Sequence, residues 1–401
     1  MTVVTSTAGY PGGAPDGRRR PVYLDYNATA PVDPRVADEV LTYMAHEFGN
    51  AGSRTHSYGQ VAKERVLRAR GEVATVVGAQ PDDVIFTSGA TESNNLAILG
   101  LEAHGVDAGK RHIISTQIEH KAVLEPLEAL AQRGFEVTFL APTAGGWVEP
   151  EAVAEALRPD TLLVSVMAVN NETGVIQPIE GIADTLAQHD AYFHVDAAQA
   201  FGKLIEPLRL PRIDLLSVSG HKIAGPKGVG ALIARRRRYK RPPLQPLMHG
   251  GGQERGLRPG TLPVALIAGL GLASALALDE ADERKKVCEA IKNELLDALM
   301  PLGITMNGDP DRTVPSVLNF SVPGVDSEAA VVALKDLVAV SNGSACTSQN
   351  YGPSHVLHAA GISESQVAGA IRLSWDASTG IGTVPASEIA ARLCALMPLE
   401  M

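Results

Sequence analysis

The strongest constraint on the fold is a set of seven short apolar runs that alternate with helical patterns between residues 84 and 234. Several of these runs are continuously apolar, as expected of strands covered on both faces. One helical pattern places Ala62, Val66, Ala69, Val73 and Val76 on a single helix face, because they are three or four residues apart. The alternation predicts an α/β domain with a largely parallel sheet. The predicted strands are 84–88, 112–115, 136–140, 162–169, 192–195, 215–219 and 231–234.

The pattern changes after Leu278, where a charged helical segment at 279–300 begins. An apolar run at 317–322, a helical pattern at 327–337 and a Gly/Ser segment follow. This order predicts a second, smaller α+β domain. Residues 1–20 are rich in Thr, Gly and Pro and contain no apolar stretch, so we expect a flexible extension there and no secretory signal.

Composition and charge narrow the class of protein. The 401 residues are 45% hydrophobic and 20% charged, which is typical of a globular protein. The formal net charge of −10 argues against direct nucleic-acid binding, which needs a basic face. The basic run 235–238 follows a predicted strand and precedes two prolines, so a solvated turn is favoured there over a nucleic-acid patch.

The cysteines and the longest apolar stretch bear on the compartment. Cys288, Cys346 and Cys394 form no C-x-x-C pair, so we expect neither a metal site nor a disulfide framework. Free thiols fit a reducing cytoplasm. The apolar stretch 262–278 is shorter than the roughly 18–20 residues that cross a bilayer. We therefore expect a soluble protein with a buried helix there and no membrane association.

Lys222 is the first candidate for chemistry. It follows the apolar run 215–219, and α/β sheets bind ligands at such strand ends. Desolvation favours the neutral amine, which can form a Schiff base with a carbonyl. Ser219 and His221 beside it offer hydrogen-bond donors suited to a phosphate ester. The alternative is a solvated loop lysine, which is the commoner role of a lysine taken alone.

Two further segments follow predicted strands. In 87–94 a strand ends, small residues turn and a helix starts, so Thr91 lies where a helix N-terminus can bind phosphate. A plain Thr or Ser N-cap is the alternative. Asp196 follows the run 192–195, and a carboxylate there can hold the pyridinium N–H of an aromatic cofactor. Its alternative is a helix N-cap.

A histidine and a cysteine complete the set of candidates. His120 lies just past the strand 112–115 and could cover a flat ring and move protons, although a structural histidine is the commoner case. Cys346 lies among small residues in the segment 342–348, where an accessible thiol suits nucleophilic or sulfur-carrying work. Cys288 and Cys394 lie in helical, partly apolar patterns and are interpreted as packing residues.

Taken together, these segments resemble the cysteine desulfurases, which are pyridoxal-phosphate enzymes of the aminotransferase class V type. The resemblance runs from about residue 22 to residue 373. Many matches in the same order make it specific, where no single match would. The matching segments are 23–31, 48–50, 88–93, 169–174, those around Asp196 and Lys222, 260–263 and 343–348.

The resemblance implies fold type I of the pyridoxal-phosphate-dependent transferases. A large cofactor-binding α/β domain, residues 32–278, would contain a seven-stranded, mainly parallel sheet. A small α+β domain would combine residues 21–31 with 279–401 and carry the catalytic cysteine loop at about 341–353.

The resemblance also implies which residues carry the chemistry. Lys222 would bind the cofactor as a Schiff base and, once freed, remove the α-proton of L-cysteine. His120 would stack on the cofactor ring and assist proton transfer. Cys346, as a thiolate, would attack the substrate sulfur. The products would be L-alanine and a persulfide on Cys346.

Binding roles follow from the same resemblance. Asp196 would pair with the ring nitrogen, and Thr261 would be a phosphate ligand donated by the second subunit of a homodimer. No metal is implied. Pyridoxal 5'-phosphate would be bound by Thr91, Asn171, Asp196, Gln199, Ser219, His221, Lys222 and Thr261, and the substrate carboxylate by Asn171 and Arg372.

The resemblance extends to partners. The segment 343–348 is similar to the group I loop, and the segment 48–56 to the DndA type, which supplies sulfur for DNA phosphorothioation. Sulfur would pass to an acceptor protein, for that pathway or otherwise for iron–sulfur cluster assembly or tRNA thiolation. Alternatives are a pyridoxal-phosphate aminotransferase or a selenocysteine lyase, neither of which needs a nucleophilic Cys346, and a non-catalytic interaction protein on the same fold.

Overall fold

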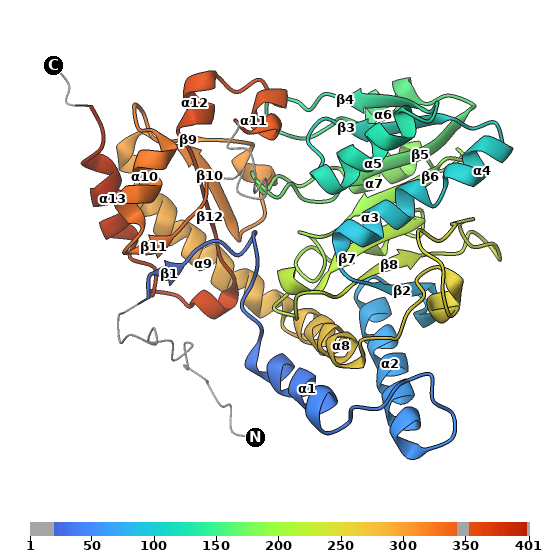
Figure 1. Ribbon diagram of the computed structural model, residues 1–401. Helices are drawn as coiled ribbons and strands as arrows, with labels where there is room; N and C mark the ends of the chain where they lie inside the picture. The colour runs from blue at the N-terminus through green and yellow to red at the C-terminus, as the bar shows by residue number, and fades with distance from the viewer. Residues whose placement is uncertain (1–19, 343–352, 399–401) are drawn as a thin grey trace. The chain divides into compact units, whose positions relative to one another are not determined.

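The computed structural model describes residues 20–342 and 353–398, and contacts divide the chain into two compact units. Unit 1 combines the described residues up to 28 with 172–174 and those from 282 onward, and unit 2 combines 29–171 with 175–281. Figure 1 shows the elements of each unit by label. The domain boundaries expected from the sequence, 32–278 for the large domain and 21–31 with 279–401 for the small one, remain a prediction.

Unit 2 is built on a sheet with the strand order β2-β8-β7-β6-β5-β3-β4. β8 runs antiparallel to both of its neighbours, and every other pair is parallel. All seven predicted strands are present, with ends that differ by no more than two residues. The mainly parallel sheet confirms the predicted fold class. The strands are β2 Val84–Thr87, β3 His112–Thr116, β4 Glu136–Leu140, β5 Thr161–Met167, β6 Tyr192–Asp196, β7 Leu215–Ser219 and β8 Gly230–Ala234.

Helices cover this sheet because each has an apolar face to bury. α3 (Ala90–Leu99) and α5 (Lys121–Ala131) lie side by side on the sheet (Figure 1) and share an apolar core with β3 and β5. α1 (Pro34–Ala45), α2 (Ser57–Val76) and α8 (Val264–Asp279) pack together. All five apolar positions predicted for α2 are buried, and α8 is the buried helix expected at 262–278. The others are α4 Glu102–Asp107, α6 Pro150–Ala156, α7 Ile179–Thr185 and the 3-10 turns Pro81–Asp83, Glu206–Arg209, Gly220–Lys222 and Gln253–Gly256.

Unit 1 contains an antiparallel sheet in which β10 (Val317–Ser321) lies between β9 (Thr305–Met306) and β12 (Ala370–Ser374). A two-stranded parallel pair, β1 (Val22–Tyr23) with β11 (Val338–Ala339), brings the start of the described chain into the unit. The helices are α9 Ala281–Leu299, α10 Ser327–Leu334, α11 His355–Ala359, α12 Glu364–Ala368 and α13 Ala386–Cys394, with 3-10 turns at Met300–Leu302, Pro310–Arg312 and Ala377–Thr379.

Among residues 20–342 and 353–398, no single helix is both long and apolar enough to span a bilayer. In this part of the chain, α8 and the segment from Ala281 to Leu302 reach the necessary length and hydropathy only when they are taken together, and the chain bends by 73° between them.

Candidate active site

Five parallel strands of unit 2 end at one edge of the sheet, and a predicted site residue follows or closes each of them. Thr91 follows β2, His120 follows β3 and Asn171 follows β5, while Asp196 closes β6 and Lys222 follows β7. Ligands of α/β sheets bind at the carboxyl ends of parallel strands. The parallel order of the sheet therefore gathers residues that lie up to 131 positions apart in the sequence, from Thr91 to Lys222.

Asp196 is buried, and two donors hold its carboxylate. The side-chain amide of Asn94, on α3, donates to Oδ2 over 2.7 Å, and the backbone N–H of Ala198 donates to Oδ1 over 2.9 Å. Each carboxylate oxygen has a second lone pair, so the group can accept further hydrogen bonds. Its position at a strand end suits a buried N–H donor on a ligand.

The side chains behind Asp196 are neutral. His194, two residues earlier on β6, is fully buried between the hydroxyls of Ser165 at 2.8 Å and Ser217 at 3.0 Å. Burial lowers the pKa of His194 to about 4, although the charge of Asp196 opposes the shift. His194 is therefore uncharged near neutral pH and adds no second charge beside the carboxylate.

Glu119 and His120 hold the turn after β3. Glu119 is fully buried, and its Oε1 accepts from the Thr116 hydroxyl at 2.9 Å and from the Met167 N–H at 2.8 Å. Burial raises the pKa of Glu119 to about 8; the Met167 hydrogen bond opposes this rise, and the charge of Asp196 adds to it. The next residue, His120, caps α5, and its Nδ1 accepts from the Ala122 N–H at 3.0 Å. This hydrogen bond places the proton of the neutral ring on Nε2.

Lys222 lies in the 3-10 turn that follows β7, together with His221. His221 contacts the Thr29 hydroxyl through Nδ1 at 3.1 Å. Burial, and then the charge of Lys222, lowers the pKa of His221 to about 4. His221 is therefore a neutral hydrogen-bonding group beside the lysine, and Thr29 fixes its ring.

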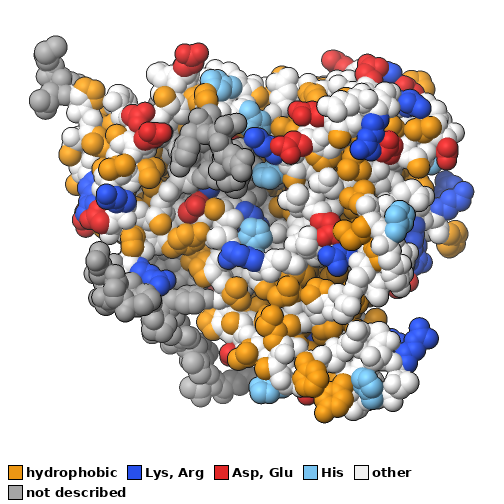
Figure 2. All heavy atoms as spheres, in the orientation of Figure 1, with side chains coloured by type: hydrophobic (Ala, Val, Ile, Leu, Met, Phe, Trp, Pro, Cys, Tyr) orange, Lys and Arg blue, Asp and Glu red, His pale blue; other side chains and the backbone are white. Residues whose placement is uncertain are grey.

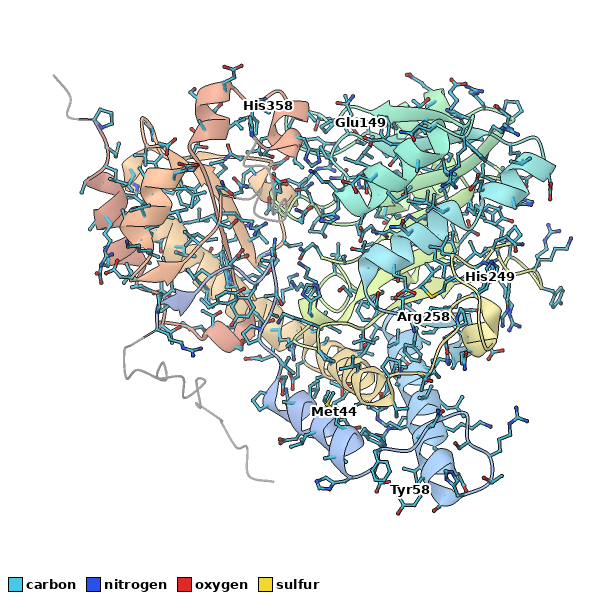
Figure 3. The ribbon with its side chains drawn as sticks, in the orientation of Figure 1. Met44, Tyr58, Glu149, His249, Arg258 and His358 are labelled. Carbon is cyan, nitrogen blue, oxygen red and sulfur yellow. The ribbon has the colours of Figure 1, made fainter. Side chains whose placement is uncertain are left out.

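The turn before α3 meets the end of β7. Gly89 precedes the helix with a φ of +155°, a conformation that favours glycine, and a Cβ built there would lie 3.7 Å from the Ser219 hydroxyl. The first turn of α3 is tied to the segment before α8, because Arg258, labelled in Figure 3, donates to Glu92 over 3.0 Å. A helix N-terminus, a hydroxyl and a glycine without a side chain form a cradle for an anion.

The remaining predicted residues are placed as follows. Gln199 is buried in the turn after β6, and Thr261 is exposed just before α8. Arg372 belongs to unit 1, where it is fully buried on β12. Cys346, with the segment 343–348, lies outside the described residues.

Three residues that contact predicted site residues were missed from the sequence: Asn94, Thr29 and Asp25, which contact Asp196, His221 and Arg372 respectively. A signal existed for each. Asn94 follows Thr91 by three positions, which places both near one face of α3. Asp25 and Thr29 lie in the segment 23–31, which carried the family resemblance without an assigned role.

Residues 22–379 match the model of the aminotransferase class-V family. The match covers most of the chain, so the chain belongs to this family. Fold type I, expected from the resemblance, is thereby confirmed.

Relatives narrow the class further. A mitochondrial cysteine desulfurase of Drosophila melanogaster is 48% identical over 355 residues, covering 88% of this chain and 76% of the relative. The crystal structure of DndA from Streptomyces lividans is 53% identical with a TM-score of 0.78, covering 88% and 99% of the two chains. A structure of SspA in complex with cysteine is 37% identical with a TM-score of 0.77, covering 88% and 98%. Within its family the chain is a cysteine desulfurase, as its motifs predict.

The family depends on pyridoxal 5'-phosphate, and the strand ends of unit 2 fit this cofactor. Asp196 offers a carboxylate to a ring N–H, and the turn at Gly89 with Ser219 offers a cradle to a phosphate. Asn94, whose side-chain amide donates to Asp196, has its Oδ1 buried without a hydrogen-bond partner among the residues that the structure describes, so a donor on a ligand beside Asp196 would find an acceptor there. The cofactor predicted from the sequence is thus consistent with the side chains gathered here.

Proposed function

We propose that this cysteine desulfurase takes L-cysteine as its substrate and transfers the sulfur to Cys346. The substrate carbon–sulfur bond breaks, a sulfur–sulfur bond forms on Cys346, and L-alanine leaves with a new C–H bond on its methyl carbon, formed from the electron pair of the broken carbon–sulfur bond and a proton equivalent to the one lost from the Cys346 thiol. The observation that carries the proposal is the gathering of Lys222, Asp196 and His120 at one edge of the parallel sheet. Pyridoxal-phosphate chemistry on an amino acid needs a lysine, a carboxylate and a proton carrier.

When bound, pyridoxal 5'-phosphate supplies an electron sink for the bonds of the substrate α-carbon. Lys222 would hold the cofactor covalently and, once released, would move the proton of the α-carbon. Asp196 would keep the ring nitrogen protonated, and Asn94 orients its carboxylate. His120 would lie against the ring and carry a proton on Nε2, because its Nδ1 accepts from the Ala122 N–H.

We assign the other predicted residues to binding. The phosphate is held by Thr91, Ser219 and His221, and the neutral His221 acts there as a hydrogen-bonding group. The substrate carboxylate is bound by Asn171 and Arg372, the latter through its guanidinium fork. Gln199 binds the ring hydroxyl.

We propose a homodimer in which Thr261 completes the phosphate site of the second copy. Thr261 is exposed, and its side chain makes no hydrogen bond within the described part of the chain. An exposed apolar patch supports the second copy. It comprises Leu41, Met44, Phe48 and Tyr58, each of which is between 52% and 66% exposed. Figure 3 labels Met44 and Tyr58, and Figure 2 shows apolar side chains gathered at the same end of unit 2. Patches of this kind mark interaction sites.

We infer that the sulfur passes to an acceptor protein in the cytoplasm, where a reducing environment keeps Cys346 a thiol. DNA phosphorothioation is the pathway favoured by the similarity to DndA, ahead of iron–sulfur cluster assembly and tRNA thiolation. The net charge of −10 favours transfer of the sulfur to a protein and argues against direct binding of this chain to DNA.

The test compares wild type with Cys346→Ala, each loaded with cofactor and incubated with L-cysteine and a thiol reductant. Alanine and sulfide are measured together. We expect equal amounts from wild type and a loss of at least about 100-fold from the variant, because a nucleophile is removed. A variant that still forms alanine and sulfide would overturn the role of Cys346 and point to a lyase that needs no such thiol, as in a selenocysteine lyase. A wild type that forms no sulfide would point to an aminotransferase. Purified protein that binds no cofactor would point to the interaction protein.

A further inference from the structure

Glu92, in the first turn of α3, places a negative charge beside the anion cradle. Its Oε2 accepts a hydrogen bond of 2.7 Å from the backbone N–H of Ser88, so the carboxylate lies directly against the turn 88–91. Burial opposes ionisation, but hydrogen bonds from Ser88 and then the charge of Arg258 outweigh it and lower the pKa of the Glu92 carboxyl. The carboxylate is therefore charged at neutral pH, next to a turn that has to receive an anion.

Arg258 offsets that charge. Its Nε donates to the other carboxylate oxygen of Glu92, Oε1, over 3.0 Å. Both side chains are largely buried, with 22% of Arg258 and 16% of Glu92 exposed. Solvent and salt screen such a pair only weakly, so the loss of one partner leaves the charge of the other acting on its surroundings.

The loop that carries Arg258 is held at two points. Gln253 Oε1 accepts from the Gly260 N–H over 2.8 Å, which closes the loop on itself. The buried carboxylate of Glu254 accepts from the Phe86 N–H over 2.8 Å, which ties the loop to β2. The guanidinium therefore belongs to a loop that is anchored to the large sheet.

We propose that Arg258 is a positioning residue for cofactor binding: by neutralising Glu92, it allows the turn 88–91 to receive the phosphate of pyridoxal 5'-phosphate. This inference rests on the proposed function, which places that phosphate at Thr91 and Ser219. Like charges at short range repel strongly where water is partly excluded. Without Arg258, the carboxylate would oppose the phosphate that the helix N-terminus attracts.

A purely structural role for the ion pair would be to tie the loop to α3. The loss of such a tie affects every form of the cofactor alike, whereas the loss of charge balance affects only a form that carries a phosphate. Pyridoxal lacks the phosphate but keeps the aldehyde through which Lys222 would hold it. We define the phosphate preference as the dissociation constant of pyridoxal divided by that of pyridoxal 5'-phosphate. Each variant is compared with wild type, so differences between the two compounds in solution cancel.

The experiment titrates each full-length protein, freed of cofactor, with either compound and follows the absorbance of the bound aldehyde. We expect Arg258→Gln to lower the phosphate preference at least about tenfold, because the charge of Glu92 is left unbalanced. Glu92→Gln keeps an oxygen that accepts from the Ser88 N–H and leaves Arg258 charged, so it should raise the preference. The double variant has a neutral pair again and should lie within about threefold of wild type. If Arg258→Gln does not fold, Glu92→Gln and the double variant carry the test.

The control is Arg133→Gln, which breaks a 2.6 Å ion pair with Glu102 elsewhere in unit 2 and should leave the phosphate preference unchanged. An unchanged preference in Arg258→Gln overturns the inference, and equal weakening of both compounds counts as unchanged. So does a double variant as impaired as Arg258→Gln, because it would mean that the substitution displaces the loop, and Thr261 with it. If wild type itself binds both compounds equally, the assigned phosphate site fails, and the inference fails with it.

Discussion

Asp196 has two fully buried titratable neighbours, Glu119 and His194. Burial favours the neutral form of each. The pKa of Glu119 is raised to about 8, and that of His194 is lowered to about 4. Near neutral pH, Glu119 is therefore protonated and His194 is unprotonated, so neither side chain places a charge beside Asp196. Asp196 is then the carboxylate at this strand end that would pair with the ring nitrogen in the proposed site.

Replacing Glu119 with glutamine should change how stability depends on pH. An unfolded glutamate titrates near pH 4.3, below the folded-state pKa of about 8. Between these values the folded protein holds a proton that the unfolded chain releases, so wild type loses stability as pH rises. Glu119→Gln lacks this loss, which amounts to roughly 1.4 kcal/mol per pH unit at most. Thermal unfolding of the cofactor-free protein at pH 5.5 and 8 measures the difference.

The matched control is Glu128→Gln, an exposed glutamate on α5. Its stability should follow wild type at both pH values. A gap between Glu119→Gln and wild type that stays constant from pH 5.5 to pH 8 would show that Glu119 is not the titrating group.

Residues could be predicted from the sequence where a local pattern marks them. Asp196 and Lys222 each close or follow an apolar strand, and the parallel sheet places such residues at one edge. The position of Asn94 near Thr91 and that of Asp25 in the segment 23–31 mark both residues, but their contacts could not be assigned, because their partners lie 102 and 347 residues away. No local pattern reports a contact over such distances.

The basic run 235–238 shows the same limit, because the solvated turn predicted there is wrong for Arg235. Arg235 is buried, and its guanidinium donates to four backbone carbonyls, those of Val77, Leu208, Leu210 and Ile213. Arg237 pairs with Asp214 over 2.5 Å. Charge in a sequence predicts solvent exposure only where no carbonyls or carboxylates converge on it.

At the scale of elements, the seven strands of unit 2 were predictable because each is long and apolar enough to stand out. β1, β9 and β11 have two residues each, which is too short for any periodicity. They are strands only because a distant segment pairs with them. The order of the large sheet was not predictable either, since β8 inserts between β2 and β7 and no local feature of its sequence indicates that place.

Gly230, the first residue of β8, should be sensitive to any side chain. A Cβ there would lie 2.3 Å from the Val218 carbonyl oxygen and 2.6 Å from Gly89 Cα, so the backbone must move. We expect Gly230→Ala to lower the free energy of unfolding by about 1–3 kcal/mol and to weaken cofactor binding, because it displaces the turn at Gly89. Chemical denaturation and cofactor titration measure the two effects.

Gly71→Ala is the opposite case. Gly71 lies inside α2, and nothing approaches its Cβ position within 4 Å. Alanine should stabilise the helix by about 0.5–1 kcal/mol without changing cofactor binding. Unchanged stability and unchanged cofactor binding in Gly230→Ala would mean that β8 and the turn at Gly89 can move apart.

At the scale of the whole molecule, the apolar patch of Leu41, Met44, Phe48 and Tyr58 should determine the oligomeric state. The rings of Phe48 and Tyr58 stack with centroids 5.5 Å apart, which makes the patch continuous at that point. We expect the double substitution Met44→Glu and Phe48→Glu to shift the protein from dimer to monomer, because both charges would be desolvated in an interface. Sedimentation equilibrium measures the mass.

The matched control substitutes Ile381→Glu, an exposed apolar residue of unit 1 that is 61% exposed. It should leave the dimer intact. A doubly substituted protein that remains dimeric would move the interface away from α1 and α2.

The ion pair between Asp25 and Arg372 also has a consequence for synthesis. Asp25 leaves the ribosome 347 residues before Arg372, and at about 5–20 residues per second some 20–70 s pass between them. During that interval the nascent chain contains Asp25 without its partner, and β10 cannot yet pair with β12. A product truncated before β12 therefore keeps the carboxylate and lacks the buried guanidinium that it contacts in the finished fold.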